Sequence, residues 1–359
     1  MTGTSLDGLD AAFCEFWQEE GQFRFDLIDC HEVPIPDKWQ ARLEHLPYQD
    51  AETFAKTHVY WGHWLGEQTR NLIQQFSWQP DFVAVHGQTI FHQPEKSFTA
   101  QIGDGESLVS YISCPVVTNF RSKNVALGGQ GAPLVPFGEQ HLFPDYDLFL
   151  NLGGFANVSF QGSGFDVAAC NLISNRLARE ISPEHAFDPE GTFAAAGNLD
   201  PDLLSKLNQL PFYRQSPPKS LGTEWIQAKL DPILHAYPGS LKDLLNTYQH
   251  HLAQQIAQAL SPFSPRRREL VVTGGGAHNR FFMELLENNL RKVGVDIASD
   301  IPKWWINYKE AIIFAFLGYC TLQGVPNTLL QEKESSQLIL GGSIHLPSDG
   351  KWYLRKTEG

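Results

Sequence analysis

The chain is organised around its opening stretch, Gly3-Thr4-Ser5-Leu6-Asp7-Gly8-Leu9-Asp10. It sets two glycines and two hydroxyl side chains around Asp7, and an apolar run from Ala11 to Phe16 follows. A tight turn of this composition can aim backbone N–H groups and hydroxyls at a phosphate, while a nearby carboxylate holds a metal-bound water. The same residue types also form ordinary hairpin turns. The stretch alone therefore leaves two interpretations open, a nucleotide site and a plain turn.

Size and composition favour a soluble protein of two domains. The 359 residues exceed the size at which one hydrophobic core usually stops growing. A formal net charge of −13 argues against a nucleic-acid surface and for a cytoplasmic protein. The five cysteines form no Cys-x-x-Cys pair, as expected for reduced thiols. Neither a signal peptide nor an apolar run of about 18 residues is visible, so we expect neither secretion nor membrane insertion.

The first third of the chain reads as a sheet with one long helix. Residues 11–17 and 23–28 predict an antiparallel hairpin, and residues 51–76 predict a helix. A short buried strand, 81–85, ends on His86, at the carboxyl end of a strand, where ligands gather in open α/β sheets. A lone histidine there can equally be structural. The glycine-rich loop 128–133 is either a hinge between domains or a place of close approach to a ligand.

The second half begins like the first. A strand at 148–151, a glycine turn at 153–157 and a strand at 158–160 suggest a weak internal duplication. A helix at 171–181, a long functional loop at 185–225 and a helix at about 239–260 are expected to follow.

A more specific signal is the run Gly274-Gly275-Gly276 between the strand 270–273 and the helix 280–293. Three glycines let a ligand approach the backbone, and the helix start offers N–H groups to a phosphate. A tight strand-to-helix turn would need only one glycine. Further on, Glu310 is expected at the head of an apolar helix that runs to Leu322, either as a cap or as a carboxylate delivered into a cleft.

Together these motifs resemble the anhydro-N-acetylmuramic acid kinase family, of the superfamily with the actin and sugar-kinase fold. The matching pieces are collinear over nearly the whole chain: GTSLDGLD (3–10), HGQTIFHQP (86–94), QIGD (101–104), the run 120–136, NLGGFANVS (151–159), KSLGTEW (219–225), VVTGGGAHNRFFMELL (271–286) and EAIIFAFLGY (310–319).

The resemblance implies an α/β fold of two actin-like, ribonuclease-H-like domains with a nucleotide cleft between them. We expect domains at 1–125, completed by 335–359, and at 126–334. The implied enzyme uses ATP and Mg²⁺ to open 1,6-anhydro-N-acetylmuramic acid with water and to phosphorylate it in cell-wall recycling. Such phosphoryl transfer needs positioned phosphates, a metal and an oriented nucleophile. The resemblance also implies a cytoplasmic homodimer.

Site residues follow from the same resemblance. Nucleotide contacts fall on three segments: Gly3, Thr4, Ser5, Asp7 and Gly8; Gly153, Gly154 and Asn157; Gly274, Gly275, Gly276 and Asn279. Asp7 would lie near the metal and Asp166 would be the general base. His86, Arg121 and Glu310 would contact the sugar, with Arg121 pairing to its carboxylate.

Two departures from the family pattern keep alternatives open. The family's Asp-Thr-Gly-Pro-Gly-Asn run reads Asp-Val-Ala-Ala-Cys-Asn at 166–171, and the strand that the family has before its phosphate turn is expected ahead of Gly3, where only Met1 and Thr2 stand. The alternatives are a kinase of a different sugar or amino sugar, and a non-catalytic nucleotide-binding protein of the same fold.

Overall fold

The computed structural model describes residues 1–359 except 4–5, 7, 218, 264–268, 332–335 and 349–359. The chain forms two compact units: unit 1 is Met1–Leu142 with Tyr308–Gly359, and unit 2 is Phe143–Asn307. The unit boundaries differ from the expected domains, which were 1–125 with 335–359 and 126–334. The physical reason is aromatic packing, because Phe137 and Phe316 stack with their ring centroids 5.9 Å apart, and Phe316 also meets Phe23 at 4.9 Å.

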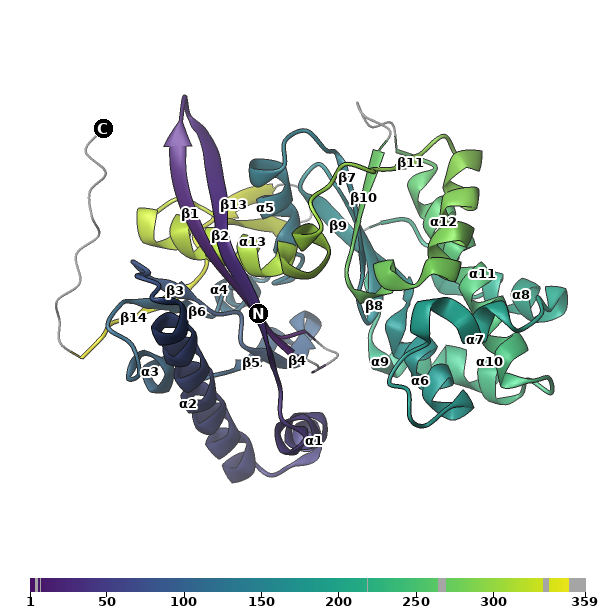
Figure 1. The fold of residues 1–359 in the computed structure, drawn as a ribbon, viewed down its shortest axis with the longest axis horizontal. Coiled ribbons are helices and arrows are strands. Elements are labelled where there is room, and N and C mark those ends of the chain that lie inside the picture. Colours follow the sequence, from purple (N-terminus) through teal and green to yellow (C-terminus); the bar gives the residue numbers. More distant parts are fainter. Residues whose placement is uncertain (4–5, 7, 218, 264–268, 332–335, 349–359) are drawn as a thin grey trace. The chain divides into compact units, whose positions relative to one another are not determined.

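Unit 1 opens with a long antiparallel hairpin, β1 (Gly8–Glu19) and β2 (Gln22–Pro34), with a register shift between Phe13 and Cys14 (Figure 1). The next elements are α1 (Asp37–His45), η1 (Leu46–Tyr48), α2 (Ala51–Phe76), β3 (Val83–Ala84), β4 (Gln88–Gln93), η2 (Pro94–Lys96), β5 (Phe98–Ile102), α3 (Gly105–Val109), β6 (Val116–Thr118), α4 (Ser122–Ala126) and α5 (Val135–Leu142). At the carboxyl end lie α13 (Trp304–Gln323), which unit 1 holds from Tyr308 onward, β12 (Thr328–Gln331), β13 (Ser336–Ile339) and β14 (Ser343–His345).

The strands of unit 1 form separate small sheets. In one, β3 pairs parallel with β6, and β14 pairs antiparallel with the other edge of β6. Its core includes Trp61 and Leu65 of α2, both buried. The helix begins where the Asp50 carboxylate accepts the Thr53 N–H, and it ends at Ser77 in a left-handed conformation.

Unit 2 is built on one five-stranded sheet in the order β11-β10-β7-β8-β9. Its elements are β7 (Leu148–Leu152), β8 (Phe155–Phe160), β9 (Ser163–Ala169), α6 (Asn171–Ile181), η3 (Pro189–Gly191), α7 (Thr192–Ala195), α8 (Pro201–Asn208), η4 (Pro211–Arg214), α9 (Thr223–Trp225), η5 (Ile226–Leu230), α10 (Asp231–His235), α11 (Leu241–Leu260), β10 (Glu269–Thr273), η6 (Gly275–His278), α12 (Arg280–Lys292) and β11 (Asp296–Ile297). β7, β8 and β9 are mutually antiparallel, whereas β10 is parallel to β7 and β11. Tyr248 of α11 is buried in the core and donates to the Ala169 carbonyl of β9 at 2.6 Å.

Three expectations about local structure are wrong. The region 185–225 is not one long loop, because Leu203 and Leu207 of α8 are buried in the core beneath α11. Asn157 lies within β8 rather than in a turn, since the turn is only Gly153 and Gly154. Glu310 lies well inside α13 rather than at its head.

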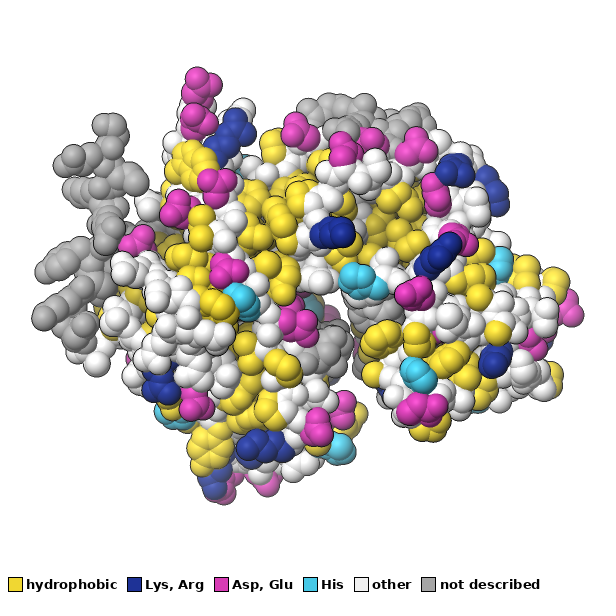
Figure 2. All heavy atoms as spheres, viewed as in Figure 1, with side chains coloured by type: hydrophobic (Ala, Val, Ile, Leu, Met, Phe, Trp, Pro, Cys, Tyr) yellow, Lys and Arg dark blue, Asp and Glu magenta, His cyan; other side chains and the backbone are white. Residues whose placement is uncertain are grey.

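The surface carries charge of both signs. On the face drawn in Figure 2, the described Asp and Glu side chains are scattered and the described Lys and Arg side chains form no continuous stripe. No helix in the part of the chain that the structure describes combines the length and apolarity needed to cross a membrane.

Candidate active site

In unit 1, His86 and Arg121 form one hydrogen-bonded pair. His86 follows β3 and is buried, and Arg121 precedes α4. The Arg121 Nε donates to His86 Nε2 at 3.0 Å, and Arg121 Nη1 donates to the Gly131 carbonyl at 2.8 Å. Burial lowers the pKa of His86 well below its usual range, and the Arg121 cation lowers it further. Two of the three residues expected to contact a sugar are therefore joined directly.

The third expected residue, Glu310, is close enough to Arg121 to interact electrostatically. Burial raises the pKa of Glu310, while Lys309 and Arg121 oppose that rise. Burial also lowers the pKa of Arg121 to about 10, against the effect of Glu310. A guanidinium and a carboxylate near a neutral imidazole can together bind hydroxyls, an amide or a carboxylate.

The loop that supplies Gly131 lies inside unit 1, away from the division at Leu142, so it is not the hinge between units. The Asn124 side chain holds it, accepting the Gly131 N–H at 2.7 Å and donating to the Leu329 carbonyl at 2.9 Å. Gly131 has φ of +65°, and a Cβ there would lie 2.6 Å from Val125. The loop's glycines thus allow the close packing that brings the Gly131 carbonyl to Arg121.

In unit 2, the turn Gly153–Gly154 joins β7 to β8 and is tied to the start of α6. The Cys170 N–H donates to the Gly154 carbonyl at 2.8 Å, and the Asn171 N–H donates to the Gly153 carbonyl at 3.1 Å. The Asn171 side chain also donates to the Leu152 carbonyl at 2.8 Å. The carbonyls of the turn are therefore directed at the start of α6. The opposite side of the turn is the side on which a ligand could bind.

The run Gly274-Gly275-Gly276 lies beside this turn. Gly274 has φ of +85°, and a Cβ there would lie 2.4 Å from Asn151 Oδ1; a Cβ on Gly276 would lie 2.7 Å from Leu152 Cβ. A Cβ on Gly275 would have Asn171 Nδ2 as its nearest neighbour, at 3.7 Å. Packing against β7 therefore requires two of the three glycines, whereas a Cβ on Gly275 would make only an ordinary van der Waals contact.

Asn279, expected to face the nucleoside, caps α12. Its side chain accepts the Phe282 N–H at 2.9 Å. A side chain on Gly191 would collide with the same Asn279 oxygen at 2.2 Å. A structural role for Asn279 is thus present whatever its contact with a ligand.

Asp166, the expected general base, lies on β9 directly across from Asn157 on β8. The Leu221 N–H donates to Asp166 Oδ2 at 2.9 Å, and the Asp166 N–H donates to the Lys219 carbonyl at 3.0 Å. Burial raises the pKa of Asp166 to about 6, and the Leu221 hydrogen bond opposes that rise. A carboxylate with a pKa near neutrality is suited to accept a proton at physiological pH.

The segment that departs from the family pattern is buried. Val167, Ala168, Ala169 and Cys170 are all part of the hydrophobic core of unit 2. Their side chains add to core packing, and Asp166 beside them on β9 is half-buried.

Other expected residues divide between described and undescribed positions. Gly8 begins β1 and Gly3 precedes it, whereas Thr4, Ser5 and Asp7 lie outside the described residues. Among the described residues, no three His, Cys, Asp or Glu side chains are close enough to share a metal ion.

Sequence reasoning missed two features near these sites. The buried Lys309 donates to the buried Glu139 of α5, an ion pair next to Glu310 in the chain. The signal for it was a lysine at the edge of an apolar run. Asn171 holds the Gly153–Gly154 turn through bonds to the carbonyls of Leu152 and Gly153, and its position at the start of a helix was the available signal.

Comparison with known proteins agrees with the motifs. A family model described as anhydro-N-acetylmuramic acid kinase matches residues 1–347. A protein of that name from Pseudomonas syringae pv. tomato is 35% identical, covering 91% of this chain and 92% of its own. One from Shewanella putrefaciens is 33% identical, covering 95% and 96%. Among solved structures, an activator of 2-hydroxyisocaproyl-CoA dehydratase from Clostridium difficile has a TM-score of 0.40 and 11% identity, covering 84% of this chain and 91% of its own. The extent of the family match shows that the chain belongs to the anhydro-N-acetylmuramic acid kinase family.

Proposed function

We propose that the chain phosphorylates 1,6-anhydro-N-acetylmuramic acid at the expense of ATP while water opens the anhydro bond. Family membership supports the substrate. The observation that carries the mechanism is Asp166, a partly buried carboxylate with a pKa raised to about 6, on the strand that pairs with β8 after the glycine turn.

The proposed reaction balances as follows. The oxygen of water bonds to C1 of the sugar, the bond between C1 and O6 breaks, and O6 bonds to the γ-phosphorus as ADP leaves. Asp166 accepts the proton that water loses. Leu221 orients the carboxylate by donating its N–H to Oδ2, and we assign the other carboxylate oxygen, Oδ1, to the water.

The chain's own groups bind the two substrates. We assign the nucleotide to Gly153, Gly154 and the backbone at Gly275, where a Cβ would come no closer than 3.7 Å to a neighbouring atom. We assign the sugar to the site of His86, Arg121 and Glu310. His86 holds the Arg121 guanidinium in place, and the other donors of Arg121 and the carboxylate of Glu310 suit the carboxylate, hydroxyl and amide groups of the sugar.

We assign a Mg²⁺ ion to Asp7. Because Mg²⁺ usually keeps several waters and binds through one or two carboxylates plus substrate phosphates, it does not require a cluster of three protein ligands. When bound, it neutralises charge that develops on the transferred phosphoryl group. We also propose that the protein is cytoplasmic and forms a homodimer, as expected from the family. Sedimentation of the purified chain tests the homodimer.

The deciding experiment is a coupled assay of ADP release with 1,6-anhydro-N-acetylmuramic acid. Turnover is expected with this sugar and to be absent with N-acetylglucosamine, which lacks the anhydro bond and the lactyl carboxylate. Turnover with N-acetylglucosamine alone would identify a kinase of another amino sugar. Binding of ATP without sugar-dependent turnover would identify a non-catalytic member of the fold.

A further inference from the structure

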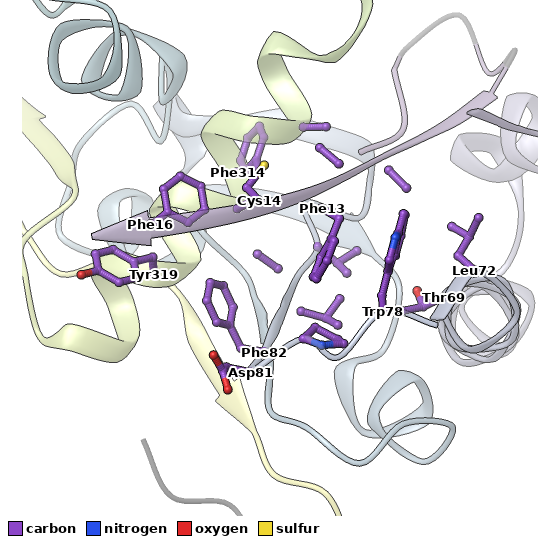
Figure 3. A pocket seen from close by; sticks show the side chains of 18 of the residues that line it. Phe13, Cys14, Phe16, Thr69, Leu72, Trp78, Asp81, Phe82, Phe314 and Tyr319 are labelled. Atoms are coloured by element: carbon purple, nitrogen blue, oxygen red, sulfur yellow. The ribbon is translucent and has the colours of Figure 1, made fainter. Parts of the chain in front are cut away.

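Helix α13 presents one face to a cavity and another face to α5. Phe314 and Tyr319 line a cavity of about 630 Å³, which β1 also borders (Figure 3). The α5 face is a stripe at helical spacing, made of Lys309, Ile313 and Phe316. Side chains at a cavity have fewer atoms to pack against, so the α5 face contributes more to fixing the helix than the cavity face does.

An apolar contact and an ion pair join α5 to this stripe. A Cβ on Gly138 of α5 would lie 2.5 Å from Ile313 Cγ2, so the two helices approach each other closely at the glycine. One turn earlier on α13, the buried Lys309 Nζ donates to Glu139 Oε1 of α5. The two contacts therefore fix the same pair of helices at neighbouring points.

The ion pair is buried almost completely. The side chains of Lys309 and Glu139 are 2% and 3% exposed. Moving two charges out of water costs hydration free energy, and apolar side chains of similar volume in the same place are often equally stabilising. Apolar side chains can slide past each other, whereas a hydrogen-bonded ion pair joins two particular atoms. A fixed position of α5 on α13 is therefore the property that the ion pair supplies and an apolar contact does not.

Each of the two helices is connected to a residue of the proposed sugar site. Glu310 follows Lys309 directly on α13. α5 begins at Val135, four residues after Gly131, and the Gly131 carbonyl accepts the Arg121 Nη1 donor at 2.8 Å. A shift of α5 along α13 would therefore move the group that holds Arg121 relative to Glu310.

Electrostatic effects show that the same groups lie close together. Burial raises the pKa of Glu310, and the cations of Lys309 and Arg121 oppose that rise. The Glu139 charge adds to the rise. Coulomb interactions weaken with distance, so both members of the ion pair lie near the Glu310 carboxylate.

We propose that the Lys309–Glu139 ion pair positions the sugar site. It fixes α5 on α13 in one register, and this register sets the spacing between Arg121 and Glu310. Neither member of the ion pair contacts the sugar itself. The inference rests on the proposed function, in which Arg121 and Glu310 bind the sugar.

The test is the double variant Lys309→Met with Glu139→Leu, which replaces both charges by apolar side chains. Titration with 1,6-anhydro-N-acetylmuramic acid is expected to give a Kd about tenfold higher than that of the natural chain. The Kd for ATP is expected to stay unchanged, because the nucleotide is assigned to unit 2. Urea unfolding of the same variant measures its stability. A purely structural ion pair would leave the sugar Kd unchanged in a variant that keeps its stability.

A second readout needs no sugar. The Gly131 N–H donates to Asn124 Oδ1 at 2.7 Å, so its hydrogen exchange measures the opening of the loop that holds Arg121. Exchange at Gly131 is expected to be about tenfold faster in the double variant than in the natural chain. The matched control is Lys56→Met with Glu52→Leu, which removes an exposed ion pair within α2 by the same substitutions. The control is expected to leave both the sugar Kd and the Gly131 exchange unchanged.

A milder variant, Glu139→Asp, tests the register if the double variant does not fold. It keeps both charges and shortens the side chain by one methylene, so the sugar Kd is expected to rise about threefold with an unchanged Kd for ATP. A natural sugar Kd in the variant that folds would overturn the proposal. If the natural chain binds no sugar, the proposed function fails. Faster exchange at Gly131 would then still support the hold of the ion pair on the loop, and unchanged exchange would overturn it.

Discussion

The Arg121 Nε donates a hydrogen bond of 3.0 Å to His86 Nε2, and this bond determines the protonation of the histidine. An arginine nitrogen can only donate, so Nε2 must be the unprotonated acceptor. The proton then lies on Nδ1, which is 2.9 Å from the Gly87 carbonyl. His86 is thus a neutral imidazole with both nitrogens engaged.

A first prediction concerns pH and stability. The pKa of folded His86 lies well below the ordinary value of 6.5, so the unfolded chain binds the additional proton as pH falls. The stabilising contribution is present above pH 6.5 and is lost below it. Urea unfolding from pH 7 to pH 4.5 is expected to show a smaller loss of stability for His86→Gln than for the natural chain. His92, with a pKa lowered to about 4, contributes in the same direction, so His92→Gln is also expected to show a smaller loss of stability than the natural chain. If the free energy of unfolding fell equally with pH in the natural chain and in His86→Gln, the result would contradict this prediction.

A second prediction concerns Asp166. Asp166→Asn is expected to lower kcat by about 10²–10⁴-fold while ATP still binds, because the amide keeps the Leu221 hydrogen bond but cannot accept a proton. For the natural chain, kcat/KM should rise with pH through about 6. The pKa of Asp166 is higher in the folded chain than in the unfolded chain, so the charged carboxylate lowers the stability of the fold above pH 6. At pH 7.5, Asp166→Asn should therefore unfold at a higher urea concentration than the natural chain. A variant with unchanged kcat would remove Asp166 from the mechanism.

A third prediction separates the glycines of the 274–276 run. Gly275→Ala is expected to leave stability unchanged, since its Cβ would lie 3.7 Å from the nearest atom. It should raise KM for ATP by about tenfold, equivalent to about 1.4 kcal/mol of lost binding. Gly274→Ala should instead destabilise unit 2 by about 1–3 kcal/mol, because of its positive φ and the contact with Asn151. Thermal unfolding and ATP titration of both variants test this difference. An equal loss of stability in Gly274→Ala and Gly275→Ala would contradict the prediction.

A fourth prediction concerns the buried pair Lys309–Glu139. Lys309→Met removes the cation and leaves the Glu139 charge buried without its ion partner, at a cost of about 3–5 kcal/mol. Changing both residues, Lys309→Met with Glu139→Leu, is expected to recover most of that loss. The measurement is a double-mutant cycle by urea unfolding. Additive losses in the cycle would show that the two side chains do not stabilise each other.

Sequence reasoning worked best where local signals and tertiary structure agree. The helix α2 has the expected bounds because an Asp50 cap begins it and a stripe of residues such as Trp61 and Leu65 holds it against the core. The glycine run after β10 was also placed correctly.

It failed where packing over long sequence distances decides the structure. Gly and Pro in 185–225 suggested a loop, yet the burial of Leu203 and Leu207 stabilises short helices. Pairing of Asn157 with Asp166 extends β8 into a segment that reads as a turn. The Lys309–Glu139 pair joins residues 170 positions apart, and a lysine at the edge of an apolar run does not reveal which residue it pairs with.

The turn Gly153–Gly154, to which we assign the nucleotide phosphates, is held by three N–H donors of the segment 170–172. Rotating its peptide planes would break those bonds, at roughly 1 kcal/mol each. The turn is therefore preorganised: its orientation is set before any phosphate arrives, and little conformational entropy remains to be lost on association. Affinity at this turn should depend on how well the ligand fits a rigid template, so nucleotides that differ only in phosphate geometry should be distinguished sharply.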